Sequence, residues 1–181
     1  MKHDHSWLVP YAEMLKGKVI LELGCGSGID STVLSEYAER LVSGDLAPKS
    51  ECRGIVLALD HSKKLPFKDC SFDAVVASLC LHYFSIKKTK EIISEISRVL
   101  KPQGSFICRL NSYKDENYGA VGYPEIESGL YNVKGEQKRF FHKQEIQALW
   151  TQGYSLNLIN HKKIDRYQKE KWVYEFSAIR V

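Results

Sequence analysis

The chain is 181 residues long, the size of one ordinary globular domain with a substantial buried core. Apolar residues make up 44% of it and charged residues 27%, which excludes an intrinsically disordered chain. The formal charge of +4 is mild, and the lysines and arginines occur in short scattered clusters. No long basic run is present, so we do not expect a nucleic-acid-binding protein.

The sequence predicts strands and helices in alternation. An apolar strand at Lys18–Leu23 precedes apolar residues at helical spacing between Ile29 and Leu41. Three further strands are predicted at RLVSGD, GIVLALD and SFDAVVASLCL. A helix with its apolar face between Ile92 and Leu100 ends before Pro102, and SFICRLN forms a fifth strand.

The second half of the chain begins with an irregular segment. From Ser112 to Arg139 the sequence is polar and without a clear period, and a segment of this length usually serves as a lid or binding loop. A helix is expected at about His142–Gln152. Two closing strands, YSLNLINHKKI and KWVYEFSAIRV, must be antiparallel, because Asp165–Lys169 is too short for a crossover helix.

This order of elements predicts an α/β fold. We expect a Rossmann-like, doubly wound, mostly parallel sheet of seven strands, with an antiparallel C-terminal strand and helices on both faces. Ligands of such sheets bind at the carboxyl ends of the strands, beside the first strand-to-helix turn. The functional site is therefore expected near Gly24–Gly28.

The stretch LELGCGSG occupies that turn and allows three kinds of cofactor. A triphosphate loop is excluded because Gly28 is followed by Ile29 and Asp30, where lysine and a hydroxyl are needed. The dinucleotide fingerprint is one residue short, although Asp45 lies at the right distance for a ribose. The carboxylate of Glu22 would repel a pyrophosphate and suits a cationic ligand such as S-adenosylmethionine.

The chain from Val19 to Ile107 resembles the class I S-adenosylmethionine-dependent methyltransferases. The resemblance rests on VILELGCGSG, GDLAP, LALDHSKKLPFKDCSFDAVVASLCLHYF and ISRVLKPQGSF, which occur in the family's order. Gln103 departs from the pattern, since the family more often has a second glycine there. The segment around FFHKQEI also resembles small bacterial methyltransferases of unassigned substrate. The resemblance implies one methyltransferase domain over residues 1–181, with a substrate-covering insert at about 112–140.

The resemblance also implies how the methionine end of the cofactor is held. Glu22 is expected to hold the methionine amine through water, and Gly24, Cys25 and Gly26 are expected to lie against the cofactor. Ser78, at the end of the fourth strand, is expected to present its backbone to the methionine end, or else to be only a strand end.

The nucleoside end is implied in the same way. Asp45 is expected to accept both ribose hydroxyls, with Leu46 packing near the adenine. Asp60 is expected to accept the adenine amino group, with the His61 backbone amide beside the ring. Two structural alternatives stay open, Asp45 as a turn residue and Asp60 as the cap of the following turn.

Catalytic candidates occur in two regions. His82 and Tyr83 follow the fourth strand, where a histidine is about as often structural as catalytic. Asp115 and Tyr118 lie in the insert, which has an acidic and phenolic character. Arg109 is expected to pair with one of the insert carboxylates, or else to bind an anionic group of the substrate.

The expected methyl acceptor is a small metabolite with a polar or cationic nucleophile. The NPPY-like motif of nucleic-acid and amide methyltransferases is absent, and ASLC stands in its place. No carboxylate or asparagine occurs at Leu81–Phe84, so no metal is expected. The alternatives are an RNA or protein methyltransferase, or a catalytically silent regulator that binds S-adenosylmethionine. A monomer or homodimer is expected.

Five cysteines occur, without the C-x-x-C spacing of a zinc site or redox pair, so free thiols in a reducing compartment are expected. The N-terminal stretch is too polar for a signal peptide, and no apolar run approaches the ~18–20 residues of a membrane span. A cytoplasmic protein without membrane contact is expected.

Overall fold

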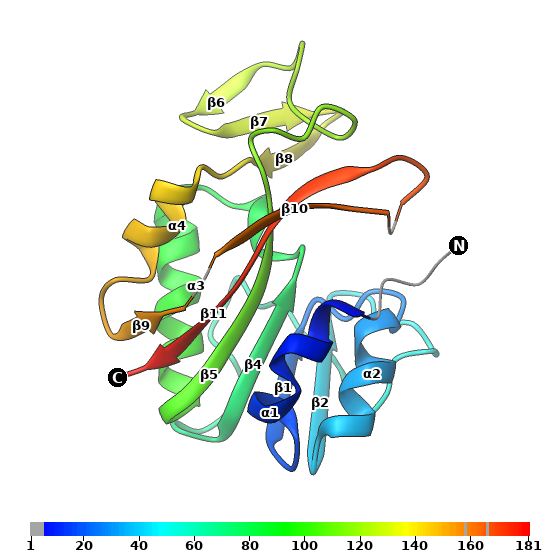
Figure 1. The fold of residues 1–181 in the computed structure, drawn as a ribbon, viewed down its shortest axis with the longest axis vertical. Coiled ribbons are helices and arrows are strands. Elements are labelled where there is room, and N and C mark those ends of the chain that lie inside the picture. The colour runs from blue at the N-terminus through cyan, green and yellow to red at the C-terminus, as the bar shows by residue number, and fades with distance from the viewer. Residues whose placement is uncertain (1–5, 158, 166) are drawn as a thin grey trace.

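A computed structural model describes residues 6–157, 159–165 and 167–181 (Figure 1). Its centre is one large twisted sheet with the strand order β10-β11-β5-β4-β1-β2-β3, in which β9 also pairs with β11. The strands of this sheet are β1 (Val19–Leu23), β2 (Arg40–Asp45), β3 (Ile55–Ala58), β4 (Phe72–Ser78), β5 (Leu100–Asn111), β9 (Tyr154–Leu156), β10 (Asn160–Ile164) and β11 (Lys171–Arg180).

The direction of the strands confirms the predicted architecture. The pairs β1–β2, β1–β4, β2–β3 and β4–β5 are parallel, whereas β11 runs antiparallel to β5, β9 and β10. The sheet has eight strands rather than the predicted seven, because the run Tyr154–Ile164 is divided into β9 and β10. Both β9 and β10 pair with successive parts of β11. The predicted single strand therefore occupies the expected place beside β11 and is only interrupted.

Helices cover both faces of the sheet, as predicted (Figure 1). One face carries η1 (Ser6–Tyr11), α1 (Ala12–Leu15) and α2 (Ile29–Tyr37), and the other carries α3 (Ile86–Val99) and α4 (Lys143–Leu149). Strand residues alternate between the two layers: Leu21 and Leu23 pack in the core with α3 and α4, while Ile20 packs with η1, α1 and α2. No helix of the described residues is long and apolar enough to span a bilayer.

Two elements, β5 and α4, have other bounds than the sequence predicted. β5 begins at Leu100 rather than at Ser105, and Gln103 within it adopts a φ of 62°. This left-handed backbone favours glycine, which is why the departure of Gln103 from the family pattern is notable. The helix α4 spans Lys143–Leu149, and the His142 amide donates to the Glu145 carboxylate (2.7 Å) at its start.

The insert forms a second, three-stranded antiparallel sheet. Its strands are β6 (Glu125–Glu127), β7 (Leu130–Val133) and β8 (Glu136–Arg139), beyond the end of β5 (Figure 1). The sequence did not predict this sheet because its strands are three or four residues long and bury few side chains, so they lack an alternating pattern.

Arg139 connects the three-stranded sheet of the insert to the segment that follows β4. Its side chain is 1% exposed and donates to the Phe84 carbonyl (3.2 Å), to the Ser128 carbonyl (2.9 Å) and to the Glu127 carboxylate. Glu127 in turn accepts the backbone amide of Ile86 at the start of α3 (2.7 Å). One arginine–glutamate pair therefore connects the small sheet to the segment that follows β4.

Replacement of Arg139 by methionine is expected to destabilise the protein by about 1–3 kcal/mol, because it leaves two carbonyls unpaired and removes the ion pair with Glu127, whose side chain is 36% exposed. Denaturant unfolding measures the loss, and hydrogen exchange is expected to accelerate across residues 125–139. Lys134→Met, on an exposed turn of the same sheet, is the control. Equal stability of the two variants would contradict the role given to Arg139.

Candidate functional site

The chain leaves β1 through a turn whose glycines are required by the protein's own packing. Gly24 has a φ of 72°, and a Cβ added there would lie 2.4 Å from the Cβ of Cys80. Gly28 has a φ of 78°, and its Cβ would lie 2.6 Å from the backbone carbonyl carbon of Glu51. Only glycine combines a positive φ with such close contacts, so the two glycines allow the turn to pack directly against Cys80 and Glu51.

A cavity of ≈ 630 Å³ opens above this turn, at the carboxyl ends of β1, β2 and β4. We call it the cofactor cavity. Most of the predicted cofactor residues line it, as do residues that follow β4. The lining residues are Gly24, Cys25, Gly26, Ser27, Ile29, Asp45, Leu46, His61, Ser78, Leu79, Cys80, Tyr83, Phe84 and Tyr167.

Asp45 connects the end of β2 to the glycine turn. One carboxylate oxygen accepts the backbone amide of Gly26 (2.9 Å), and the other accepts that of Ala47 (3.1 Å). Each oxygen of a carboxylate can accept more than one hydrogen bond, so the group can also receive ligand hydroxyls. The arrangement is compatible with both sequence-based readings, a ribose acceptor and a turn residue.

Glu22 and Asp60 lie outside the cavity lining as the described residues define it. Glu22 is 2% exposed, and its carboxylate accepts the Ser43 hydroxyl (2.7 Å). Asp60 accepts the hydroxyl (2.6 Å) and the amide (3.0 Å) of Ser62, and these hydrogen bonds lower its pKa. Asp60 therefore has the geometry of the turn cap, and the cofactor roles of both residues stay predictions.

The part of the cavity that the sequence assigns to the nucleoside offers apolar and aromatic surfaces. Leu46 is 70% exposed. The rings of His61 and Phe84 pack edge to face, with their centroids 5.5 Å apart. The Nε2 atom of His61 lies 3.3 Å from the Cys80 carbonyl oxygen, and burial lowers the pKa of the imidazole. A neutral imidazole beside a leucine suits a flat, uncharged ring such as adenine.

The charge of the cavity distinguishes between the cofactors that the sequence left open. Its described lining residues include one carboxylate, that of Asp45, and no lysine or arginine. A dinucleotide pyrophosphate would depend there on backbone amides at the start of α2, without a cationic side chain among the described lining residues. A cofactor with a sulfonium and an ammonium group fits the residues present.

A second, smaller cavity of ≈ 160 Å³ lies beside the first, and we call it the inner pocket. The two share Leu79, Tyr83 and Tyr167 as lining residues. The inner pocket is lined in addition by His82, Asn111, Tyr118, Lys138 and Lys171. Three of the four predicted catalytic residues, His82, Tyr83 and Tyr118, therefore meet in one place.

His82 is a neutral base within this pocket. It is 4% exposed, and its Nδ1 atom has no hydrogen-bond partner among the described residues. Burial holds its pKa well below 6.5, and the positive charges of Lys171 and Lys138 lower it further. The neighbouring ring of Tyr83 lies 4.2 Å away, and burial raises the pKa of Tyr83 to about 12, so this phenol stays protonated.

Asp115, the fourth predicted catalytic residue, is already paired. It is 3% exposed, with one oxygen 3.0 Å from the Lys171 ammonium and the other accepting the Tyr118 amide (3.3 Å). It lies outside the inner pocket as the described residues define it, whereas Lys171 lines it. Burial lowers the pKa of Lys171, and the Asp115 charge opposes that effect.

Sequence reasoning missed both lysines of the inner pocket. Lys171 begins β11 and Lys138 lies on β8, so neither is near His82 in the chain. The available signal was that Lys171 shares one strand face with Val173 and Glu175, a face that the structure buries. Polar residues on a buried face indicate a site or an ion pair.

Arg109 does pair with a carboxylate, but the predicted partner was wrong. It is fully buried and contacts Glu175 of β11 (2.6 Å), not an acid of the insert. The reason is register, because the antiparallel pairing of β5 with β11 places Arg109 opposite Glu175. Its guanidinium also lies 4.6 Å from the ring centroid of Trp7.

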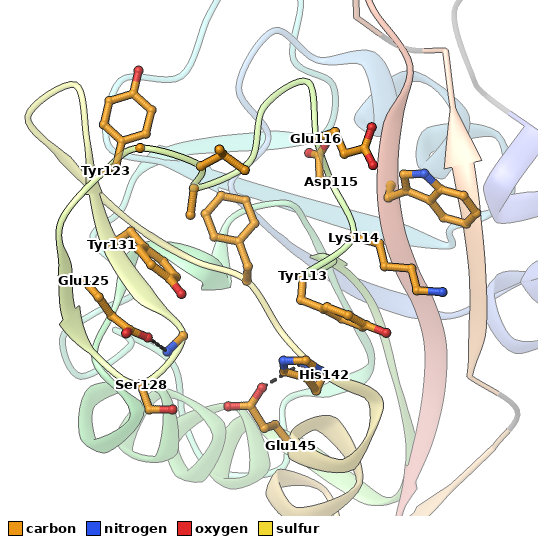
Figure 2. A pocket seen from close by; sticks show the side chains of 16 residues that line it. Tyr113, Lys114, Asp115, Glu116, Tyr123, Glu125, Ser128, Tyr131, His142 and Glu145 are labelled. Atoms are coloured by element: carbon orange, nitrogen blue, oxygen red, sulfur yellow. Dashed lines mark hydrogen bonds between the residues drawn. The ribbon is translucent and has the colours of Figure 1, made fainter.

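The acidic and phenolic side of the insert faces a third cavity, of ≈ 1050 Å³, between the insert and α4 (Figure 2). Figure 2 shows Tyr113, Tyr123 and Tyr131 around it. The carboxylate of Glu125 accepts the Gly129 amide there (2.8 Å), so this acid is engaged by the insert's own backbone. This cavity and the cofactor cavity share none of their described lining residues.

Known proteins resemble this chain in sequence and in fold. Residues 21–108 match the family model described as a methyltransferase domain. An uncharacterized methyltransferase of Schizosaccharomyces pombe is 29% identical over 180 residues, covering 88% of this chain and 60% of that protein. The chain spans 65%, 60% and 44% of the length of three curated relatives that it matches.

Two solved structures share the fold. A SAM-dependent methyltransferase of Methanosarcina mazei has a TM-score of 0.77 at 20% identity, covering 96% of this chain and 97% of that one. The 1,6-didemethyltoxoflavin-N1-methyltransferase of Burkholderia thailandensis, solved with 1,6-didemethyltoxoflavin and S-adenosylhomocysteine, has a TM-score of 0.73 at 18% identity. It matches 98% of this chain and 80% of its own.

The family match, the strand order and the cavity above the glycine turn agree with one another. Residues 21–108 match a methyltransferase domain, and the chain has the class I fold of solved S-adenosylmethionine-dependent methyltransferases. The cofactor of this class is S-adenosylmethionine.

A matched pair of glycine substitutions tests the packing of the turn. Gly28→Ala and Gly17→Ala both place alanine at a positive φ, which costs about 1–2 kcal/mol. Gly17 has open space around it, whereas Gly28 abuts Glu51, so Gly28→Ala is expected to lose about 1–3 kcal/mol more. Urea unfolding measures both losses, and equal values would show that the turn can relax.

The Asp45→Ala variant is expected to bind S-adenosylhomocysteine more weakly by about 1–3 kcal/mol, because hydrogen bonds to a charged acceptor are lost. Titration calorimetry measures the affinity. Glu36→Ala, which removes an exposed carboxylate of α2, is the control. An unchanged affinity in Asp45→Ala would leave Asp45 with the turn role alone.

Proposed function

We propose that the protein transfers a methyl group from S-adenosylmethionine in the cofactor cavity to a small polar metabolite in the inner pocket. The observation that carries the proposal is that Leu79, Tyr83 and Tyr167 line both cavities and form a wall between them. The buried, neutral His82 lines the inner pocket beside this wall. A donor and an acceptor bound on the two sides of such a wall are held in reacting proximity.

The cofactor is held by backbone and by few side chains. Gly24, Cys25 and Gly26 contribute the surface under the methionine end, and the backbone of Ser78 limits it. Asp45 accepts the ribose hydroxyls, and the adenine lies between Leu46 and His61. Glu22 and Asp60 act from outside the described lining, Glu22 through water.

The chemistry requires little from the protein beyond position. When bound, S-adenosylmethionine supplies a methyl group already activated on a sulfonium, and in-line attack by the acceptor leaves the carbon–sulfur electron pair on sulfur. His82 takes the acceptor's proton at Nδ1, in the tautomer with its own proton on Nε2, since Nδ1 is unpartnered among the described residues. Tyr83 stays protonated and donates a hydrogen bond, and Tyr118 orients the acceptor.

The size of the inner pocket favours a small molecule. Its volume of ≈ 160 Å³ is close to the roughly 150 Å³ cavity that accommodates benzene. The alternatives are an RNA or protein substrate that inserts one group, and a silent regulator that binds the cofactor alone. We further propose a single cytoplasmic domain over residues 1–181, monomeric or homodimeric, whose insert at 112–140 covers the acceptor.

Three measurements separate these possibilities. Calorimetry is expected to show binding of S-adenosylmethionine and none of NAD, and the reverse would overturn the proposal. A gel shift with RNA at low salt is expected to be negative, since a positive and salt-sensitive shift supports the macromolecular alternative. A metabolite screen scored by release of S-adenosylhomocysteine is expected to find a turned-over compound, which the silent regulator would not.

The neutral state of His82 makes a prediction about stability. Because folding depresses this pKa, the unfolded chain binds a proton near pH 6.5 that the folded chain does not. The stabilisation is therefore fully present above pH 6.5 and is lost as the pH falls below it, by up to about 1.4 kcal/mol per pH unit.

The His82→Gln variant is expected to lose part of this dependence, and urea midpoints at several pH values below 7 measure it. Lys171, Lys138 and Tyr83 are the groups around the imidazole, and all three remain in the variant. An identical decline in wild type and variant would mean that His82 is charged in the folded protein. For an identified acceptor, kcat is expected to fall in the same variant.

A further inference from the structure

The inner pocket is lined by two cations and by polar side chains that include both donors and acceptors. Lys171 and Lys138 both line it, and none of its described lining residues is a carboxylate. Its phenols are those of Tyr83, Tyr118 and Tyr167. The pocket therefore differs in charge from the cofactor cavity beside it, whose described lining contains a carboxylate and no lysine or arginine.

Lys171 is a built feature of this pocket. Its side chain is 9% exposed, and its ammonium contacts Asp115 at 3.0 Å. The ammonium lies 5.3 Å from the ring centroid of Tyr118 and 5.8 Å from that of Tyr167. An ammonium has three donors, and the single oxygen of Asp115 accepts one of them. Asp115 thus holds the ammonium of Lys171 in place, while other N–H donors of the ammonium remain for a ligand.

The carboxylates nearest to the two lysines reduce the positive charge, but neither is a described lining residue of the inner pocket. Asp115 is among the described lining residues of the third cavity and not among those of the inner pocket. Glu136 contacts Lys138 at 3.1 Å, but its side chain is 67% exposed, so water screens the pair. Within the pocket a ligand would therefore meet the two ammonium groups before either carboxylate.

Two buried polar atoms indicate that the pocket receives a polar ligand. The Nδ1 atom of His82 and the Oδ1 atom of Asn111 are buried and have no partner among the described residues. Both residues line the inner pocket. A buried polar atom without a partner is costly, and a bound polar ligand removes that cost.

We propose that the methyl acceptor is a small organic acid, whose anionic group is bound by Lys171 with the help of Lys138. The proposal rests on the proposed function and specifies its substrate class. It replaces the cationic acceptor suggested by the acidic residues of the insert, because Asp115 is paired with Lys171, and Glu125 and Glu127 hold the insert itself. Lys171 is thereby the residue that determines specificity for the acid.

Three probes of nearly equal size test the charge preference. Benzoate, benzamide and benzylamine are titrated against the protein saturated with S-adenosylhomocysteine, and ligand-observed NMR measures each dissociation constant. Benzoate is expected to bind at least about tenfold more tightly than the other two, as one charge-assisted hydrogen bond predicts. Equal or tighter binding of benzamide or benzylamine would overturn the proposal, as would the absence of binding by all three.

Variants assign the preference to the lysines. Lys171→Met alone leaves Asp115 buried and unpaired, so the double variant K171M/D115N is made beside it. Both are expected to bind benzoate about as weakly as benzamide, and Lys138→Met is expected to lose a smaller part of the preference. Lys87→Met, on the exposed side of α3, is the control and is expected to keep it. A full preference for benzoate in the double variant would overturn the role of Lys171.

Cofactor affinity separates the two levels of the proposal. Neither lysine is among the described lining residues of the cofactor cavity, so all four variants are expected to bind S-adenosylhomocysteine as the wild type does. Failure of the wild type to bind it would overturn the proposed function. Normal binding of S-adenosylhomocysteine without a preference for benzoate would overturn only the acidic acceptor.

Discussion

The contact between the glycine turn and the segment after β4 is the constraint on which both pockets depend. Gly24 lies against Cys80, whose thiol donates to the Leu23 carbonyl (3.1 Å) at the end of β1. Leu79 adopts a φ of 54°, and its amide donates to the Arg109 carbonyl (2.9 Å). These contacts hold the start of this segment at the carboxyl ends of β1 and β4. Leu79 and Tyr83 therefore lie between the cofactor cavity and the inner pocket and line both.

The strand β11 supplies a second organising principle, because it places charges on a buried sheet face. Glu175 pairs with Arg109, and Lys171 pairs with Asp115. Buried ion pairs stabilise a fold weakly, since desolvation offsets most of their attraction. Their value here lies in position: Arg109–Glu175 links β11 to β5, and Asp115 holds the ammonium of Lys171 beside the inner pocket.

The two halves of the site were predictable to different degrees. The cofactor cavity is built from short stretches that each follow one strand, and their order and spacing are visible in the sequence. Asp60 shows the limit, because its neighbour Ser62 engages the carboxylate in a local turn that spacing alone does not distinguish from a ligand contact. The inner pocket combines Lys171 of β11, Lys138 of β8 and His82, which no local pattern connects.

The sequence by itself determined the mostly parallel sheet with an antiparallel C-terminal strand, the helices on both of its faces and the position of the glycine turn, because these follow from local periodicity and from glycine's backbone freedom. Only the tertiary structure decided the charge of the inner pocket. The insert appeared acidic as a list of residues, yet Glu127, Asp115 and Glu125 are engaged by Arg139, by Lys171 and by a backbone amide, respectively. Long-range pairing decides which charges a ligand meets, and composition alone cannot show it.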